Sequence, residues 1–469
     1  MMRIEQSILI SFGISLLLMA VGTAAAEAPA EEWNMTFGSA YNDGAFSVHQ
    51  LSDDGYILAG YYAQDSSYNS TDAWLIKNYA NGTEEWNRTF GGSLYDCANS
   101  VQQTSDGGYI IAGYTRSFGA VETDALLIKI DANGNEEWNR TFGGEQYDGF
   151  TSVQQTSDGG YIIAGYLNND AWLIKIYANG TEEWNKTFSG GAYPRFTSVQ
   201  HTSDGGYIIA GYLNSDAWLV KIDANGNEEW NRTFDGSSYY DYAYSVQQTS
   251  DGGYIIAGST GSQDSDFLLI KTYADGTEQW IKTFDGSPYD CAESAQQTSD
   301  GGYIIAGRTY STANSNEVWL IKTYADGTEE WNMTLGGTGN DEALSVQQTS
   351  DDGYIIAGRT AANGNDAWLI KLAGNDQVEA DPVDALEELQ DYVNDEIASA
   401  STVKTLNKKL DSVITLLTKG EDESAIDKLE GFIDTVVGLK KSKKLTGDQA
   451  EYLITEAEKI IELIENSEG

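Results

Sequence analysis

The chain repeats one unit of about 50 residues, and this repeat constrains the fold more than any other feature of the sequence. The tryptophan of EEWN-like strings recurs at Trp33, Trp86, Trp138, Trp184, Trp230, Trp280 and Trp331. The tyrosine of DGGY-like strings recurs at Tyr56, Tyr109, Tyr161, Tyr207, Tyr254, Tyr303 and Tyr354. The lysine of WLIK-like strings recurs at Lys77, Lys129, Lys175, Lys221, Lys271, Lys322 and Lys371. Each landmark occurs seven times, so the sequence contains seven copies of one structural unit.

Each copy predicts four short β-strands joined by tight turns. In the second copy SVQQ leads through SDGG into YIIAG, whose β-branched residues favour a buried strand. ALLIKI and EEWNRTF follow, and the Asn-Gly pair in the turn between them supplies the positive φ of a hairpin. Four strands in about 50 residues is the size of a propeller blade, so we expect an all-β seven-bladed β-propeller over residues 31–372. A solenoid of β-arches is the alternative, although solenoids normally use shorter repeats.

The two ends of the repeat region are complementary. It opens with a lone EEWNMTF string at residues 31–37 and stops after the WLIK string that ends at Lys371, without an EEW strand of its own. The first strand can therefore complete the last blade. This closure would remove the free strand edges that an open array exposes.

The repeat resembles the propeller repeats of bacterial and archaeal surface proteins, through its DGGYIIAG, WLIK and EEWN strings. It is more distantly similar to the quinoprotein-type repeat, which carries a tryptophan on the outer strand. The resemblance implies the fold and no particular activity. Quinoproteins that bind the cofactor use eight blades and a vicinal cysteine pair, whereas this chain has seven copies and two separated cysteines, Cys97 and Cys291. No quinone cofactor is therefore expected.

The segment after Leu372 predicts helices instead of strands. Residues 373–382 form a short acidic linker, and a four-helix domain is expected over residues 383–466. Apolar residues with helical spacing place its helices near 383–397, 402–418, 423–439 and 447–465. The segment resembles the FIMAH module found at the C-termini of extracellular proteins, through Phe432, Ile433, Ala450, Leu453, Ala457 and Ile460. Asp434, Thr435 and Val436 depart from the motif. The resemblance implies surface association or packing and no established activity.

The first 26 residues predict a cleavable secretory signal. Arg3 precedes an apolar run from Ile8 to Val21, and three alanines ending at Ala26 supply the small residues of a cleavage site. The run is short for a membrane-spanning helix, and no second apolar stretch follows. We therefore expect a mature chain without a membrane span that is secreted or held at the cell surface.

The net charge of the chain restricts the classes of partner that it can bind. Seventy-two acidic against 27 basic side chains give a formal net charge of −45. Such a charge repels nucleic acid and anionic lipid, and it attracts cations. The expected partner is a surface protein or an envelope glycan, and the protein itself is expected to be monomeric.

A repeated aspartate is the main candidate for a metal site. It occurs where the first strand of six copies begins, at Asp43, Asp96, Asp148, Asp241, Asp290 and Asp341, whereas the fourth copy has Pro194 there. Six carboxylates converging on a central channel would repel one another unless a cation offset them, and Ca²⁺ prefers such oxygen ligands. The alternative is that each aspartate caps its own turn or bonds a neighbouring blade. No cofactor is certain, and Ca²⁺ is the one that this ring would hold.

Variable loops mark the same face of the propeller. The loops between YIIAG and WLIK are long in copies one, two and six and very short in copies three and four. Binding residues usually lie on variable loops over a rigid scaffold. The candidate ligand-binding residues are therefore Tyr62, Tyr68, Phe118 and Tyr310 in or beside the long loops, with Arg195. An aromatic and acidic rim of this kind suits a glycan or a basic peptide.

The sequence predicts a secreted or cell-surface scaffold that binds through this loop face and is not an enzyme. It has no Ser-His-Asp arrangement, zinc-ligand spacing or phosphate loop, and His49 and His201 occupy different repeat positions. An envelope module that binds glycan or calcium is one alternative. A polysaccharide lyase or glycoside hydrolase is another, since carboxylates are abundant. Of the recurring N-glycosylation sequons, Asn69, Asn81 and Asn179 lie in a loop and in hairpin turns and are expected to be accessible.

Overall fold

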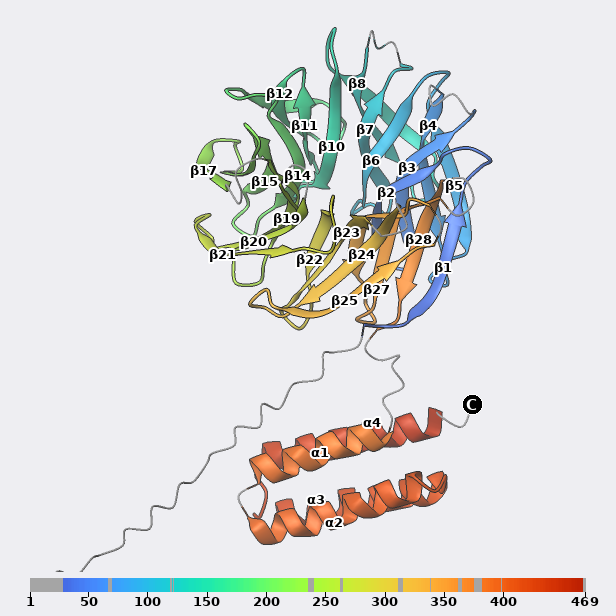
Figure 1. Cartoon of the computed structure of the whole chain (residues 1–469), viewed down its shortest axis with the longest axis vertical. Coiled ribbons are helices and arrows are strands. Elements are labelled where there is room, and N and C mark those ends of the chain that lie inside the picture. The colour runs from blue at the N-terminus through green and yellow to red at the C-terminus, as the bar shows by residue number, and fades with distance from the viewer. Residues whose placement is uncertain are drawn as a thin grey trace, which may run out of the picture.

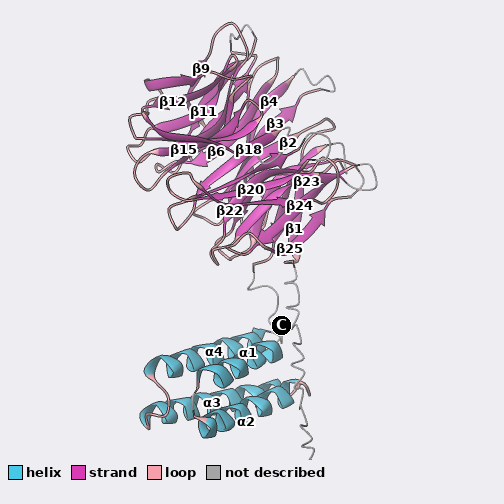
Figure 2. Ribbon diagram, turned by 60° about the vertical axis from the view of Figure 1, so that its left-hand side comes forward, coloured by secondary structure: helices cyan, strands magenta, loops and turns pink. Residues whose placement is uncertain are grey.

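Seven four-stranded antiparallel sheets form a β-propeller, and four helices follow (Figures 1 and 2). This computed structural model describes residues 28–65, 70–118, 120, 122–234, 240–261, 265–310, 315–337, 339–361, 365–374, 382–397 and 399–466. The predicted fold class, including both the propeller and the helical segment, is confirmed. The expected secretory signal, residues 1–26, lies outside the described residues, as do residues 375–381 of the expected linker.

The strands of each blade follow one another in the sequence. Blades 1 to 3 contain β2 (Gly44–Gln50), β3 (Tyr56–Ala63), β4 (Thr71–Asn78) and β5 (Glu84–Phe90); β6 (Asp96–Gln103), β7 (Tyr109–Thr115), β8 (Asp124–Ile130) and β9 (Glu136–Phe142); and β10 (Asp148–Gln155), β11 (Tyr161–Leu167), β12 (Asp170–Ile176) and β13 (Glu182–Phe188). Blades 4 and 5 contain β14 (Arg195–His201), β15 (Tyr207–Leu213), β16 (Asp216–Ile222) and β17 (Glu228–Phe234); and β18 (Asp241–Gln248), β19 (Tyr254–Thr260), β20 (Asp266–Thr272) and β21 (Glu278–Phe284). Blade 6 contains β22 (Cys291–Gln297), β23 (Tyr303–Tyr310), β24 (Asn316–Thr323) and β25 (Glu329–Leu335). Blade 7 contains β26 (Glu342–Gln348), β27 (Tyr354–Thr360), β28 (Asp366–Leu372) and the N-terminal β1 (Glu31–Phe37).

The N-terminal strand closes the ring, as predicted. β1 is the outer strand of blade 7 and pairs antiparallel with β28, so that Trp33 lies opposite Lys371 and Phe37 opposite Ala367 (Figure 1). The amide of Ala373 also donates to the carbonyl oxygen of Ala30 at 2.9 Å. Every blade therefore has four strands.

Apolar cores lie between blades. Alternate residues of a strand point to opposite faces of its sheet, and in β7 Ile111 packs toward blade 1 while Ile110 and Ala112 pack toward blade 3. A strand that is buried on both faces needs apolar residues at every position, which explains the YIIAG string. Seven clusters of described buried residues join neighbouring blades in this way.

Polar side chains of the first strands join the blades around the central axis. The first glutamine of the SVQQ string accepts a hydrogen bond from the next blade, as when the amide of Gln50 donates to Oε1 of Gln347 at 2.9 Å. The second glutamine bonds back, since Oε1 of Gln50 accepts from the amide of Ser350 at 2.8 Å. These contacts occur where blade 7 meets blade 1, so the closing junction is built like the others.

The other repeated landmarks also make junction or hairpin contacts. Trp86 packs edge-on against Tyr109 of the next blade, with ring centroids 6.0 Å apart. The buried Lys129 forms ion pairs with Asp106 at 3.0 Å and with Glu137 at 3.1 Å, which ties the SDGG turn to the outer strand. The tryptophan, tyrosine and lysine recur because the contacts recur.

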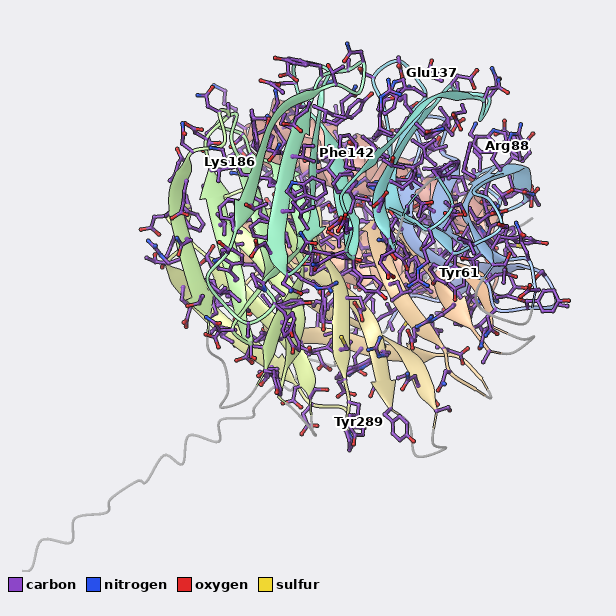
Figure 3. All side chains as sticks on the ribbon, turned by 90° about the horizontal axis from the view of Figure 1, so that it is seen from above. Tyr61, Arg88, Glu137, Phe142, Lys186 and Tyr289 are labelled. Atoms are coloured by element: carbon purple, nitrogen blue, oxygen red, sulfur yellow. The ribbon has the colours of Figure 1, made fainter. Side chains whose placement is uncertain are left out.

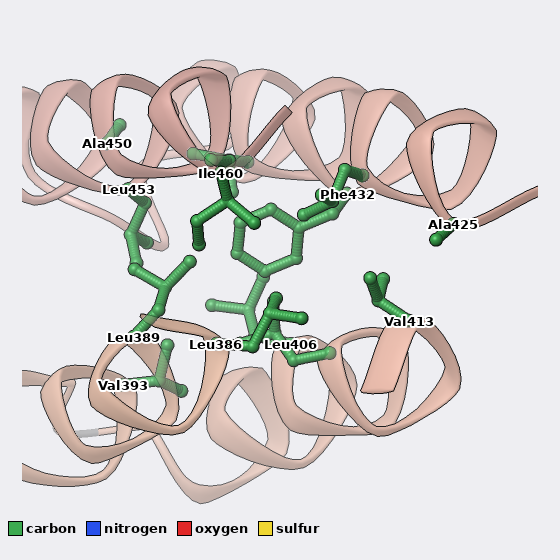
Figure 4. Packing of buried hydrophobic residues seen from close by; sticks show 14 of the residues in the cluster. Leu386, Leu389, Val393, Leu406, Val413, Ala425, Phe432, Ala450, Leu453 and Ile460 are labelled. Carbon is green, nitrogen blue, oxygen red and sulfur yellow. The ribbon is translucent and has the colours of Figure 1, made fainter. Parts of the chain in front are cut away.

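The four helices form a separate apolar core. They are α1 (Pro382–Glu396), α2 (Ala400–Leu417), α3 (Asp422–Lys441) and α4 (Gly447–Asn466). Phe432 is fully buried at the centre of this core, where its ring faces residues such as Leu406 and Ile460 (Figure 4). Within the described residues, no helix combines the length and the apolar character that crossing a membrane requires.

Deletion of residues 28–37 is expected to make the propeller self-associate, because β28 would then present an unpaired edge. Size-exclusion chromatography with light scattering should show oligomers, and the Tm should fall. A synthetic peptide of residues 28–38 should restore the monomer. A truncated protein that stays monomeric with an unchanged Tm would contradict the closing role of β1.

The stability of the fold should decrease in acid. Although burial opposes ionisation, hydrogen bonds from Thr104 and Gly108 and the ion pair with Lys129 lower the pKa of Asp106 to about 2. The same pattern lowers the pKa of Asp158, Asp204 and Asp251 to about 2. A carboxyl whose pKa is lower in the folded chain stabilises the fold above its unfolded value of 3.8, and this stabilisation is lost as the pH falls toward 2.

This expectation can be checked by measuring the Tm between about pH 6 and pH 2. A variant in which the four aspartates are replaced by asparagine should lose less Tm over this range than the unaltered protein. Parallel curves for the two proteins would show that these aspartates do not carry the acid sensitivity.

Candidate functional site

One end of the central channel is lined by cross-strand pairs whose identity changes from blade to blade. The first strand of each blade contacts the first strands of both neighbours, so these strands surround the axis. At this end the residue after each AG dipeptide pairs with a residue near the start of the first strand. The pairs are Tyr61 with Gly44, Tyr114 with Cys97, Tyr166 with Gly149, Tyr212 with Arg195, Ser259 with Tyr242, Arg308 with Cys291 and Arg359 with Glu342. We call these fourteen residues the channel mouth.

The glycine of the AG dipeptide is required by a bulge in the first strand. The pairing register shifts between Ala98 and Ser100, which brings the backbone of β6 close to that of β7. A side-chain carbon on Gly113 would collide with the carbonyl oxygen of Cys97. The bulge and the glycine together fix how the next residue, Tyr114, is presented at the mouth.

Blades 6 and 7 place charged residues at the mouth. Arg359 forms an ion pair with Glu342 at 2.8 Å, and Arg308 contacts Glu293 at 3.0 Å and Glu342 at 3.4 Å. Burial opposes the ionisation of Glu342, but the two arginines hold its pKa below the usual value. For Glu293 burial outweighs the attraction of Arg308, so its pKa is raised. The two carboxyls therefore differ in acidity although they share one arginine.

Blades 2 to 4 place aromatic residues and two further arginines near the mouth. Tyr95 and Tyr114 are stacked, with centroids 5.7 Å apart. The guanidinium carbon of Arg195 lies 3.9 Å from the ring centroid of Tyr166, which is a close cation–π contact. Arg116 lies 5.8 Å from the centroid of Tyr147 and donates to Thr123. Neither Arg116 nor Arg195 forms an ion pair with a carboxylate in the described part of the chain.

Three pockets around the mouth each combine an arginine with tyrosines. Pocket A, of about 360 Å³, is lined by Asn42, Tyr61, Thr71, Tyr95, Asn340, Glu342, Arg359 and Asn365. Pocket B, of about 370 Å³, is lined by Tyr95, Tyr114, Arg116, Thr123, Tyr147 and Tyr166. Pocket C, of about 380 Å³, is lined by Tyr242, Tyr244, Ser259, Gly261, Ser265, Tyr289, Asp290, Cys291, Arg308, Tyr310 and Asn316. Pockets A and B share Tyr95, so they form one continuous surface.

The structure separates the residues that were expected to bind a ligand. Tyr310 lines pocket C beside Tyr289, with centroids 6.0 Å apart, and Tyr289 projects from the edge of the propeller (Figure 3). Arg195 lies at the mouth, whereas Phe118 is exposed outside the three pockets. Tyr62 instead packs against Trp74 at 5.3 Å, beside the core between blades 7 and 1. Tyr68 lies outside the described residues.

The repeated aspartates are buried and bonded within their own blades. Asp148 shows the pattern, since it accepts hydrogen bonds from the amides of Gly144 at 2.8 Å and Asn168 at 2.7 Å. Equivalent backbone amides bond Asp43, Asp96, Asp290 and Asp341, and Asp241 is buried at the same position. Among the described residues, the grouping of three carboxylates close enough to share a metal ion is Asp266, Asp285 and Asp290. It contains one member of the expected ring, so the six do not gather at a common point.

Two of the three asparagines expected to be accessible to glycosylation are exposed. Asn81 and Asn179 are exposed in hairpin turns, where their Oδ1 atoms accept hydrogen bonds from the backbone amides of Thr83 and Thr181, and Asn69 lies outside the described residues.

Cys97 and Cys291 are buried and free of disulfides, and burial raises the pKa of Cys97 to about 12. A thiol with so high a pKa is a poor nucleophile.

The variable residues of the mouth carry a signal in the sequence that the prediction of the site did not use. In an almost invariant YIIAG string, the next position is Tyr, Tyr, Tyr, Tyr, Ser, Arg and Arg through the seven copies. A position that varies inside a constant repeat is free from the packing that fixes its neighbours. Arg308 and Arg359 could have been found in this way.

Comparison with known proteins bears on each of the two parts of the chain. Residues 383–462 match the family model of the FIMAH domain, and no curated protein matches the chain. A protein of unknown function from Dyadobacter fermentans is 11% identical over 74% of this chain and 99% of its own, with a TM-score of 0.48. YCF48 bound to D1 peptide is 11% identical over 76% and 100%, with a TM-score of 0.48. The WD40 domain of Pan2 from Neurospora crassa is 9% identical over 70% and 89%, with a TM-score of 0.47.

The chain is a seven-bladed β-propeller protein. Its C-terminal helices match the FIMAH domain over residues 383–462, as the sequence predicted. The resemblance to the solved structures is too distant to extend from the fold to a ligand.

Replacing Glu342 by Gln should destabilise the propeller by about 1 kcal/mol, because it removes the buried charged partner of Arg359, whose own side chain is 36% exposed. Unfolding by guanidinium chloride measures this loss. Glu122→Gln, which alters an exposed carboxylate, is the matched control and should have little effect. If Arg359→Gln and Glu342→Gln proved additive in the double variant, the ion pair would not be energetically coupled.

Proposed function

We propose that the protein is a non-catalytic interaction scaffold that binds an acidic segment of a partner protein at the channel mouth. The observation that carries this proposal is the set of three pockets that each join an arginine to tyrosines. Tyrosine and arginine are the side chains that most often dominate the binding energy of protein interfaces. A rigid ring of blades holds these side chains in place before a partner arrives, which lowers the entropic cost of binding.

The charges favour an acidic ligand over the basic peptide that the aromatic and acidic rim of the loop face suggested. Arg116 and Arg195 lie on the side of the mouth formed by blades 2 to 4, and neither forms an ion pair with a described carboxylate. Arg88, Arg140 and Arg232 also form no ion pair with a described carboxylate, but they lie over tryptophans of the outer strands and not at the mouth. A carboxylate from a ligand can form bidentate hydrogen bonds with a guanidinium that already lies over a tyrosine ring.

The location of this activity is part of the proposal. We place the scaffold outside the cell, secreted or on the cell surface and monomeric, with a surface protein as its partner. Support comes from the signal-like residues 1–26 and from the resemblance of the helices to a module of extracellular proteins. N-terminal sequencing of the protein from its host should begin at Glu27, and an N-terminus at Met1 would contradict secretion by cleavage.

A glycoside hydrolase is the second candidate, favoured by one observation. Glu293 and Glu342 both contact Arg308, and their pKa values are shifted in opposite directions. A carboxyl with a raised pKa beside one with a lowered pKa is the arrangement of a general acid and its partner. Release of sugars from envelope polysaccharide, abolished by Glu293→Gln, would establish this activity in place of the scaffold.

Fluorescence anisotropy with a labelled poly-glutamate peptide tests the proposed function. The unaltered protein should bind the peptide at low salt, and affinity should fall with ionic strength because charge contributes to binding. Replacing both Arg116 and Arg195 by Gln should weaken binding at least about tenfold, the effect of losing roughly 1.4 kcal/mol.

The control variant replaces Arg88 and Arg232 by Gln. Both arginines stack on tryptophans of outer strands, away from the mouth, and Figure 3 shows Arg88 at the periphery. This variant should bind like the unaltered protein. Equal loss in the two variants would show that binding follows overall charge. Binding of polygalacturonate in place of the peptide would assign the mouth to an acidic glycan.

A further inference from the structure

Buried carboxylate pairs lie between neighbouring blades, and each pair includes one of the repeated aspartates already described. The third strand of a blade carries an aspartate at its start, such as Asp72 in β4 and Asp366 in β28. Each lies beside the repeated aspartate of the next blade, Asp96 and Asp43 respectively. At the closing junction the amide of Asp43 donates to the carbonyl oxygen of Asn365, which fixes the approach of the two segments.

A glycine separates the two carboxylates of each pair. A side-chain carbon on Gly38 would lie 2.5 Å from Oδ1 of Asp366 and 2.7 Å from Oδ2 of Asp43. Gly91 stands in the same relation to Asp72 and Asp96. Two oxygens from different blades therefore face one small space over the glycine Cα.

One oxygen of each pair has no hydrogen-bond partner. Oδ1 of Asp72 and Oδ1 of Asp366 are buried and accept no hydrogen bond, and both residues are only 8% exposed. These are the same two atoms that face the partner carboxylate. Oδ1 of Asp124, which faces Oδ2 of Asp148 over Gly143 between blades 2 and 3, is a third such atom. A buried carboxylate oxygen normally finds a donor, so three such atoms at equivalent places indicate that something absent from the protein chain binds them.

The contacts of the pairs leave their charge uncompensated. Asp43 accepts from the amides of Ser39 and Ala63, and Oδ2 of Asp72 accepts from the amide side chain of Gln64 at 2.6 Å. These donors are neutral. Across the described ranges, no lysine or arginine forms an ion pair with any of the four aspartates. Two buried carboxylates at close range need either a cation or a proton between them.

We propose that the junction between blades 7 and 1 and the junction between blades 1 and 2 each bind a divalent cation of the Ca²⁺ type. The ligands are Oδ1 of Asp366 with Oδ2 of Asp43, and Oδ1 of Asp72 with Oδ2 of Asp96. Ca²⁺ takes carboxylate oxygens at about 2.3–2.6 Å in irregular geometry and accepts water in the remaining positions. These sites differ from a single ring in the channel, because each one bridges two blades.

A third junction has the same arrangement with one more carboxylate. Between blades 5 and 6, Asp266 and Asp290 occupy the equivalent positions. Asp285 occupies the repeat position that Gly91 has at the junction of blades 1 and 2. One oxygen from each of these three residues lies within 4.8 Å of the others. The replacement of glycine by aspartate adds a ligand to the same space, which is the change expected of a cation site.

Isothermal titration calorimetry with CaCl₂ on the full chain, after dialysis against EDTA, tests the proposal, with MgCl₂ as a parallel titration. Calcium should bind and raise the Tm, because it binds the folded junctions and not the unfolded chain. The double variant Asp72→Asn and Asp366→Asn should bind one fewer ion for each altered junction and show a smaller rise in Tm.

Asp170→Asn is the matched control. Asp170 starts β12 at the same strand position, but blade 4 has Pro194 where the partner aspartate would be, so this junction has no carboxylate pair. Its calcium stoichiometry should equal that of the unaltered protein. Asp285→Gly, which recreates the residue of other blades at an exposed position, should lower affinity at the third junction without affecting folding.

Three results would overturn the proposal. One is the absence of calcium binding at millimolar concentration. Another is an unchanged calcium stoichiometry in the double variant together with an unchanged calcium affinity in Asp285→Gly. The last is a double variant that is more stable than the unaltered protein in EDTA while calcium has no effect on either, since a shared proton would then hold each pair.

Discussion

The contact between neighbouring blades is the interaction on which the rest of the structure depends. A blade is apolar on both faces of its inner strands, so it cannot be stable without a blade on each side. The glutamines of the first strands and the tryptophan–tyrosine pairs repeat the same contact at successive junctions. A ring is the arrangement in which no blade lacks a neighbour, and β1 supplies the strand that completes it.

This dependence explains why the fold could be predicted from the sequence. A residue that makes a junction contact must recur in every blade, so Trp86 and Tyr109 stand out as landmarks of a repeat in the amino-acid sequence itself. Lys129 recurs in the same way because its ion pairs hold the strands of one blade together. The helices were also placed within two residues of their observed ends, because apolar spacing records which face is buried. The sequence repeats because the same contacts are made in each blade and at each junction.

For the candidate site, the sequence predicted which face of the propeller carries it but not which residues line it. Tyr61 and Tyr62 are neighbours in β3, but successive side chains point to opposite sides of a strand, so Tyr61 lines the mouth and Tyr62 packs against Trp74. The bulge in each first strand changes which of its side chains point to which face of the sheet, and the amino-acid sequence alone does not give the position of the bulge. The repeated aspartates were found, but each one's neighbour comes from the third strand of the preceding blade. Asp72 lies beside Asp96 only because the ring brings two blades together.

The closure by β1 also sets the order in which the propeller can fold. Glu31 pairs with Leu372, so the strand that leaves the ribosome first must wait for the strand that is made last. Contacts so distant in sequence form slowly, because the intervening chain must be ordered before they can be made. Until then β1 is an unpaired edge, and its exposed Glu31 and Glu32 discourage pairing with another chain. Glu31 and Glu32 therefore also protect the incompletely folded propeller from pairing with other chains through β1.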